Sequence, residues 1–203
     1  MGIYLKENEI GFDVKKVGFP GLGSCMGIVL QTDHGLFGFH SFGNNNPKGG
    51  TFGTYCQTHA HYGTPVHLYG SCRWEKRYAG GNKFLSWVEE MKFIALQLNY
   101  GGTVSGFDIS NKASGVATVG NNSAYLEYKR DSTNSQVSIR FADSDAVTTT
   151  SQEGVATPVR VIRPNNEVAT PYKSRVVASA KPKVGGPGFA NVGDDGFYSI
   201  RLP

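Results

Sequence analysis

The chain has 203 residues and a mass of 21.9 kDa, which suits one domain with a substantial hydrophobic core. Hydrophobic residues make up 39% of it and aromatic residues 12%, a composition that excludes wholesale disorder. The net charge of +4 comes without a dense Lys/Arg run, and no apolar stretch approaches the roughly 18 residues of a membrane-spanning helix, so we expect neither nucleic-acid binding nor membrane insertion.

The N-terminal residues and the cysteines bear on the compartment. The chain begins Met-Gly-Ile-Tyr-Leu-Lys-Glu-Asn-Glu, without an apolar segment preceded by basic residues, so we expect no secretory signal peptide. Three cysteines, Cys25, Cys56 and Cys72, leave at least one thiol unpaired within the chain. This odd number fits a reducing compartment or a reactive thiol. A protein of this kind that leaves its producing cell would need a route without a cleaved signal.

Residues 3–5 and 11–17 predict two short strands, separated by polar residues. Residues 19–21, Phe-Pro-Gly, then predict a break in regular structure. A nucleophile on a turn at this point, ahead of the next strand, would be exposed while its backbone stays rigid. We therefore expect the thiol of Cys25 to be presented to solvent rather than buried.

The functional interpretation is built on residues 21–43. A Gly-rich turn places Cys25 at the head of an apolar run, and a second, aromatic run ends in His40. If both runs are strands joined by a polar turn, pairing Leu30 with Gly35 sets Cys25 opposite His40 on one face. An imidazole that takes the proton of a neighbouring thiol makes a thiolate–imidazolium pair, which is a strong nucleophile.

The glycines ahead of the cysteine have a role in the same hypothesis. Gly21 and Gly23 allow a sharp bend that can turn backbone N–H groups near Ser24 and Cys25 toward one point. Such a group of N–H donors is what an oxyanion hole requires, so Gly23 and Ser24 are candidate support residues. The alternative is a buried, inert cysteine beside a satisfied histidine.

Residues 41–53 contain three consecutive asparagines, a proline and a Gly-Gly pair, and they predict a loop at the mouth of the site. The loop either contacts substrate or is merely a long connection.

Residues 54–77 predict aromatic-rich strands with surface histidines. The alternative is a zinc site, because the segment carries five residues with N or S ligands: Cys56, His59, His61, His67 and Cys72. Their spacing is unlike that of paired structural zinc signatures, so we expect no metal. A further possible role for His59 or His61 is to line the active-site cleft.

Residues 82–100 predict the clearest helix. Asn82 is a plausible N-cap, Gly101 and Gly102 supply the stop, and apolar residues recur at steps of three and four. Glu89 and Glu90 are expected on the polar face. The apolar stripe predicts core packing against a sheet.

From Thr103 onward the pattern is one of strands and turns, with candidate strands at 103–110, 117–119, 124–129 and 136–142. Several strands after one strong helix predict an α+β fold, a β-sandwich or mixed sheets backed by at least one long helix.

Near residue 148 the composition changes, and Val-Ala-Thr-Pro at 155–158 recurs at 168–171. We therefore expect a catalytic domain over residues 1–147 and a Pro/Gly-rich C-terminal extension over 148–203. The extension either packs on or wraps the same domain, or serves as a partner-binding or delivery tail.

The run Gly-Leu-Gly-Ser-Cys-Met-Gly-Ile-Val-Leu at residues 21–30, followed by a turn and Gly-Phe-His, resembles the active-site segment of the chemoreceptor glutamine deamidase CheD. The separation of Cys25 from His40 is also similar to that in the cytotoxic necrotizing factor deamidase toxins. The resemblance covers about residues 17–43. It implies a CheD-like or necrotizing-factor-like catalytic fold with Cys25 as nucleophile, His40 as general base and acid, and no cofactor.

One position departs from the family pattern. CheD-like members carry a threonine six residues before the cysteine that orients the histidine, and this chain has Phe19 there. The orienting group is therefore either a backbone oxygen, with Phe19 as the candidate, as in the necrotizing-factor toxins, or a group from elsewhere in the chain.

The resemblance implies a protein glutamine deamidase that works through a thioester, or a transglutaminase if an amine replaces water. Its partner would be a protein that bears the target glutamine, either a chemoreceptor in a bacterial cytoplasm or a small GTPase in a target cell. The Pro-rich C-terminus and the Phe19 departure favour a toxin-like effector acting in the target-cell cytosol, which would also have a delivery or immunity partner. The alternatives are a cysteine protease with the same residue pair and a non-enzymatic binding module with a structural cysteine.

Overall fold

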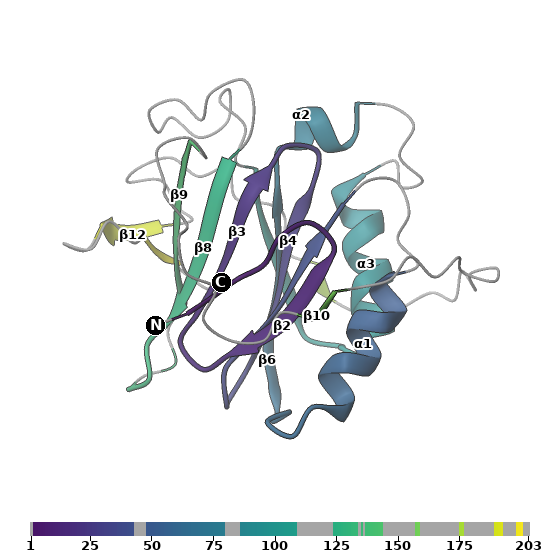
Figure 1. Cartoon of the computed structure of the whole chain (residues 1–203), viewed down its shortest axis with the longest axis vertical. Coiled ribbons are helices and arrows are strands. Elements are labelled where there is room, and N and C mark those ends of the chain that lie inside the picture. The colour runs from purple at the N-terminus through teal and green to yellow at the C-terminus, as the bar shows by residue number, and fades with distance from the viewer. Residues whose placement is uncertain are drawn as a thin grey trace.

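The computed structural model describes residues 2–42, 48–79, 86–108, 124–133, 135 and 137–143, and four short strands nearer the C-terminus. These parts form a mixed α+β structure with two sheets and, on one side, helices (Figure 1). No helix within the described ranges is long and apolar enough to cross a membrane.

The larger sheet has seven strands in the order β10-β2-β5-β4-β6-β7-β11. Strands β2, β5, β4 and β6 are antiparallel neighbours, whereas β7 runs parallel to β6. Every residue of the central β4 is buried, because both faces of the sheet are covered. The strands are β2 (Glu9–Asp13), β4 (Met26–Thr32), β5 (Leu36–Ser41), β6 (Pro65–Cys72), β7 (Thr103–Asp108), β10 (Thr157–Pro158) and β11 (Arg175–Val176).

The smaller sheet has six strands in the order β1-β3-β8-β9-β13-β12. They are β1 (Ile3–Tyr4), β3 (Lys16–Leu22), β8 (Ala124–Arg130), β9 (Val137–Asp143), β12 (Phe189–Val192) and β13 (Tyr198–Ile200). Strand β3 enters the turn that carries Cys25, and β4 leaves it, so the candidate site lies where the chain passes from one sheet to the other.

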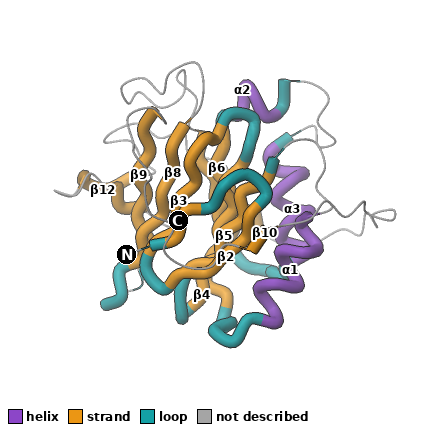
Figure 2. Tube along the Cα trace, in the orientation of Figure 1, coloured by secondary structure: helices purple, strands orange, loops and turns teal. Residues whose placement is uncertain are grey.

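Two helices, α1 (Lys48–Thr58) and α3 (Trp87–Gln97), pack along the larger sheet, and the short α2 (Trp74–Arg77) follows β6 (Figure 2). Side chains alternate along β4, so Ile28 and Leu30 join the core beneath the helices while Val29 joins the core between the sheets. The result is three layers, with the larger sheet in the middle. The α+β expectation with two sheets is therefore confirmed.

The helices differ from the sequence prediction in length. Both α1 and α3 span 11 residues, so the expected long helix is not confirmed. Helix α3 begins after Ser86, whose side chain accepts the Glu89 N–H at 3.2 Å, and it ends well inside the predicted 82–100. Asn82 lies outside the described residues.

Helix α1 contradicts the loop predicted at 41–53 and the strand predicted after it. Its glycines have low helix propensity, which is why the sequence pattern misses it. They also permit close packing on α3, because a Cβ at Gly49 would lie 3.0 Å from the Phe93 ring and one at Gly53 would overlap the Gln97 carbonyl oxygen. Tertiary packing outweighs local propensity here.

The predicted break at 19–21 lies inside β3. The strand continues to Leu22 with an irregular register between Phe19 and Leu22, and Gly21 takes a φ of 76°. A glycine adopts this left-handed conformation at low cost, so the bend is accommodated without ending the strand. The candidate strand at 117–119 lies outside the described residues.

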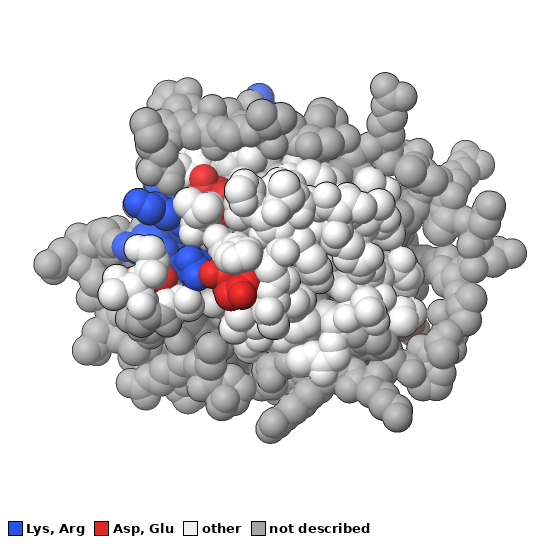
Figure 3. Space-filling view, turned by 90° about the horizontal axis from the view of Figure 1, so that it is seen from below, with Lys and Arg blue, Asp and Glu red and all other residues white. Residues whose placement is uncertain are grey.

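Segments from the C-terminal quarter of the chain pair with both sheets. Strand β10 pairs with β2 and β11 with β7, at the two edges of the larger sheet, while β13 pairs with β9 in the smaller one. Figure 3 shows the molecule from below relative to Figure 1, and most of the described Lys, Arg, Asp and Glu side chains in view lie together at the left of the picture.

Candidate functional site

Cys25 and His40 lie on the same face of the β4–β5 hairpin but are not directly opposite each other. The ladder pairs Gly27 with His40 and Leu30 with Phe37. The predicted register, with Leu30 opposite Gly35, is therefore wrong by two residues. Because side chains alternate with a period of two, an even shift leaves both side chains facing the smaller sheet, now as diagonal neighbours.

The turn explains the register. The Thr32 N–H donates to the Gly35 carbonyl at 2.8 Å, and the Thr32 hydroxyl accepts the N–H groups of His34 and Gly35 at 3.2 Å each. The turn is thereby reduced to Asp33 and His34 at its tip, shorter than the polar turn expected from the sequence. A threonine hydroxyl that accepts N–H groups from its own turn stabilises the turn and so disfavours continuation of the strand.

The ring of His40 is anchored from outside the hairpin. Its Nδ1 lies 2.8 Å from the main-chain oxygen of Leu5, and since a carbonyl only accepts, Nδ1 carries the proton. In that tautomer Nε2 has a lone pair, and within the described structure this buried atom has no hydrogen-bond partner. The Asn8 N–H donates to the His40 carbonyl at 2.8 Å, so the segment after β1 holds both the ring and the backbone of His40.

The expected backbone oxygen is thus present, but it belongs to Leu5 rather than to Phe19. Phe19 instead packs its ring edge-on against His40, with centroids 6.0 Å apart and an interplanar angle of 84°. Leu5 lies 35 residues from His40 in sequence, and no local pattern pointed to the contact.

Burial controls the protonation of His40, which is 1% exposed. The pKa of His40 is lowered from 6.5 to about 4, mainly by the loss of solvent. The hydrogen bond to the Leu5 carbonyl partly offsets this effect, and the positive charge of Arg77 adds to it. His40 is therefore neutral at neutral pH. The resting form of His40 is thus the neutral imidazole and not the imidazolium of the expected thiolate–imidazolium pair. A neutral imidazole can accept a proton as a base.

The expectation of a presented thiol is wrong. Cys25 is 3% exposed and belongs to the core between the two sheets. Because β3 runs on to Leu22, only residues 23–25 remain to turn the chain before β4, and this short connection draws Cys25 inward.

The turn itself uses part of the expected oxyanion nest. The Gly23 N–H donates to the Gly21 carbonyl at 2.9 Å, so Gly23 stabilises the bend rather than directing its N–H outward. Ser24 is half-buried, and its carbonyl accepts a hydrogen bond from Arg77 at 2.9 Å.

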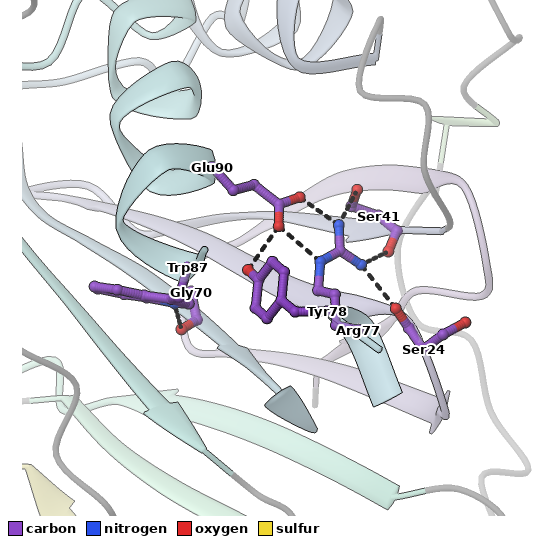
Figure 4. Close-up of polar contacts among 7 residues, drawn as sticks. All are labelled: Ser24, Ser41, Gly70, Arg77, Tyr78, Trp87 and Glu90. Carbon is purple, nitrogen blue, oxygen red and sulfur yellow. Dashed lines mark hydrogen bonds and ion pairs between the residues drawn. The ribbon is translucent and has the colours of Figure 1, made fainter. Parts of the chain in front are cut away.

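A buried ion pair that the sequence did not indicate lies beside this turn (Figure 4). Arg77, at the end of α2, and Glu90, on α3, are 3% and 1% exposed. The Arg77 Nε donates to Glu90 Oε2 at 2.8 Å, and the Arg77 Nη2 contacts the other carboxylate oxygen. The Tyr78 hydroxyl donates to Glu90 Oε2 at 2.7 Å. The carboxylate raises the pKa of Arg77 above its ordinary value despite burial, so the side chain stays charged.

The guanidinium also reaches both strands of the hairpin. Its Nη1 donates to the carbonyls of Ser24 at 2.9 Å and Ser41 at 3.2 Å, and its Nη2 donates to the Ser41 hydroxyl at 3.3 Å. Figure 4 shows Arg77 between Glu90 on one side and the two serines on the other. The site therefore contains a fixed cation next to the residues that flank Cys25 and His40.

The expectation that Glu90 occupies a polar helix face is wrong. One signal could have revealed it, because Glu90 falls three residues after Trp87 and four before Ile94, within the apolar stripe of α3. A carboxylate in such a stripe requires a buried partner.

The five candidate zinc ligands lie in different surroundings. Cys56 and Cys72 are in the core beneath the helices, and His67 is buried between the sheets with its Nε2 2.8 Å from the Ser105 hydroxyl. His59 and His61 pack against the Phe12 ring, with centroids 4.8 and 5.5 Å away. In the described ranges, no three metal-ligating side chains come together.

No family model matches the chain, and the search of curated proteins finds no match.

Proposed function

We propose that the protein deamidates a glutamine side chain of a protein substrate, with Cys25 as the nucleophile and His40 as general base and acid. One observation carries the proposal. His40 is held by the Leu5 carbonyl in the tautomer that leaves Nε2 as a proton acceptor, and that atom is buried, unpartnered in the described structure, and on the face that also carries Cys25. A neutral imidazole of this kind is the form in which histidine acts as a general base.

The chemistry follows from these two side chains. Sγ of Cys25 forms a bond to the carboxamide carbon while its proton moves to Nε2 of His40, and the carbonyl oxygen becomes an oxyanion. The N–H groups near Ser24 and Cys25 are the proposed oxyanion donors. The imidazolium then gives its proton to the leaving amine, which departs as ammonia and leaves a thioester. His40 next takes a proton from water, whose oxygen attacks the thioester carbon, and the products are glutamate and the free thiol. An amine in place of water gives transglutamination.

The resemblance supports the same proposal from another side. The necrotizing-factor toxins orient their histidine with a backbone oxygen, and here the Leu5 carbonyl occupies that role. We include a CheD-like or necrotizing-factor-like catalytic fold in the proposal, supported by the two face-to-face sheets with helices against the larger one. The proposed setting is that of a delivered effector acting on a small GTPase or a receptor-like protein.

Burial imposes a condition on this function. A substrate glutamine reaches the thiol only if the cover over Cys25 opens, because 3% exposure leaves no path for a carboxamide. The same burial favours a second candidate function, a non-enzymatic binding module in which Cys25 is a structural core residue.

The test is ammonia release from purified small GTPases and chemoreceptor cytoplasmic fragments, together with the mass change of amide to acid at a glutamine. We expect both signals with wild type and with Cys56→Ala, whose thiol lies beneath the helices. We expect neither with Cys25→Ser nor with His40→Ala. Full activity in either of these two variants refutes the assignment, and backbone cleavage instead of deamidation indicates a protease.

A further inference from the structure

We infer that Arg77 is a positioning residue for the Cys25–His40 pair, acting through the main-chain carbonyls of Ser24 and Ser41. The inference rests on the proposed function, because it gives Arg77 a role in the same reaction. Arg77 contacts neither the substrate nor a reacting atom. Its role is to hold in place the two strand ends that carry Cys25 and His40.

The hairpin ladder does not perform this task alone. The last pair of the β4–β5 ladder is Met26 with Ser41, so Ser24 and Cys25 lie beyond it. The Arg77 Nη1 bridges the gap, since it donates to the Ser24 carbonyl at 2.9 Å and to the Ser41 carbonyl at 3.2 Å. Ser24 directly precedes Cys25, and Ser41 directly follows His40. One rigid group thus ties together the peptide units next to both side chains.

The orientation of the guanidinium is itself fixed. Glu90 takes the Nε and Nη2 donors with its two oxygens, and Tyr78 hydrogen-bonds the same carboxylate. A planar fork held along one edge presents its remaining donors in one direction, which a lysine ammonium cannot do. The Ser41 hydroxyl, 3.3 Å from Nη2, completes the contacts on the hairpin side.

The positive charge of Arg77 also affects the pKa of His40. The Leu5 carbonyl and the Phe19 ring approach the His40 ring from the smaller-sheet side, Cys25 lies on the same face of the hairpin, and the charge of Arg77, on α2, acts on the ring. Of these groups Arg77 carries the full positive charge, and that charge helps to keep the pKa of His40 low. The same residue therefore fixes the geometry of the pair and favours the neutral imidazole.

The test compares Arg77→Lys, which keeps the charge and loses the fork, with the double variant Arg77→Met/Glu90→Met, which removes the buried pair without leaving one charge uncompensated. Glu127→Gln is the matched control, because Glu127 is a fully buried carboxylate paired with Lys16 at 3.2 Å on the other face of the smaller sheet. Far-UV circular dichroism establishes that each variant is folded.

For deamidation we expect kcat to fall about 10²-fold in both Arg77 variants with KM little changed, because misplaced reacting groups slow chemistry without weakening substrate binding. By NMR, the His40 ring should titrate at higher pH in the double variant than in wild type, and at the wild-type pH in Arg77→Lys and Glu127→Gln. Alkylation of Cys25 by iodoacetamide should be faster in both Arg77 variants and not in the control, because loss of the contact with the Ser24 carbonyl lowers the cost of exposing the thiol.

Folded Arg77 variants with wild-type kcat, Cys25 alkylation and His40 titration overturn the inference while leaving the proposed function intact. A wild-type protein that releases no ammonia and whose Cys25 does not react overturns the proposed function, and the positioning role falls with it. A loss of kcat in Glu127→Gln equal to that in Arg77→Lys also overturns the inference, because the effect would then be one of general stability.

Discussion

Acidification should destabilise the folded protein through its buried histidines. The pKa of His40 gives the expected loss in the free energy of unfolding. Its pKa is about 4 in the folded state against an ordinary 6.5, so folding favours the neutral ring. A lowered folded-state pKa gives stability that is complete above 6.5 and is lost as the pH falls toward 4. The full difference corresponds to about 3 kcal/mol, of which about 2 kcal/mol is already lost near about pH 5.

The measurement is urea unfolding, followed by far-UV circular dichroism, at about pH 7.5 and about pH 5 for wild type, His40→Gln and His67→Gln. His67 serves as the internal comparison, because burial also lowers its pKa from 6.5 to about 4. Each glutamine variant removes one titrating ring. We therefore expect the loss of stability between the two pH values to be smaller by about 2 kcal/mol in either variant than in wild type.

Two results would refute this reasoning. One is an equal pH dependence in wild type and His40→Gln, which would mean that His40 titrates alike in the folded and unfolded chains. The other is an NMR titration of the His40 ring near its ordinary pKa, which would mean that the ring is hydrated and that its Nε2 is not buried.

Two further predictions concern the packing around the pair. Gly27→Ala places a Cβ 2.8 Å from the Phe19 ring, so it should cost about 1–3 kcal/mol in urea unfolding, and unchanged stability would contradict the edge-on packing of Phe19. The buried hydroxyls of Ser71 and Tyr128 lie 2.7 Å apart, so Ser71→Ala and Tyr128→Phe should each cost about 1–3 kcal/mol because the partner is left unsatisfied. The double variant should cost less than the sum, and strict additivity in the double-mutant cycle would rule out the hydrogen bond.

Much of the architecture around the site could be predicted from local patterns. The apolar runs of β4 and β5, joined by a turn rich in polar residues, predicted the hairpin, and the recurring apolar residues predicted α3. The shared face of Cys25 and His40 followed from the period of two, even though the register was wrong. Such features depend on neighbours in sequence, which is why a single sequence reveals them.

The remaining features of the site depend on contacts between distant residues. The Leu5 carbonyl is an ordinary backbone group and carries no sequence signal, and its contact with His40 arises because β1 joins the smaller sheet beside β3. Glu90 falls in the apolar stripe of α3, but its pairing with Arg77 carries no sequence signal, because it depends on the packing of α2 against α3 and the hairpin end. The burial of Cys25 likewise required the continuation of β3 through Leu22.

The burial of Cys25 and His40 bears on both candidate functions, the deamidase and the non-enzymatic binding module. A site removed from water holds His40 neutral and strengthens any electrostatic stabilisation of an oxyanion, yet it also hides Cys25 from a substrate. An enzyme can have both properties only if the cover opens at a free energy well below that of global unfolding. A structural cysteine needs no such opening, so the cost of exposing Cys25 distinguishes the two functions.

That cost can be measured from the alkylation rate of Cys25 as urea is added below the unfolding transition. Local opening exposes little surface, so the rate should rise only weakly with urea if the protein is an enzyme. Cys56 is the matched control, because it is fully buried, its pKa lies well above the ordinary value, and its alkylation should follow global unfolding with the full urea dependence. If the two thiols show the same steep dependence, Cys25 is a core residue and the deamidase assignment fails.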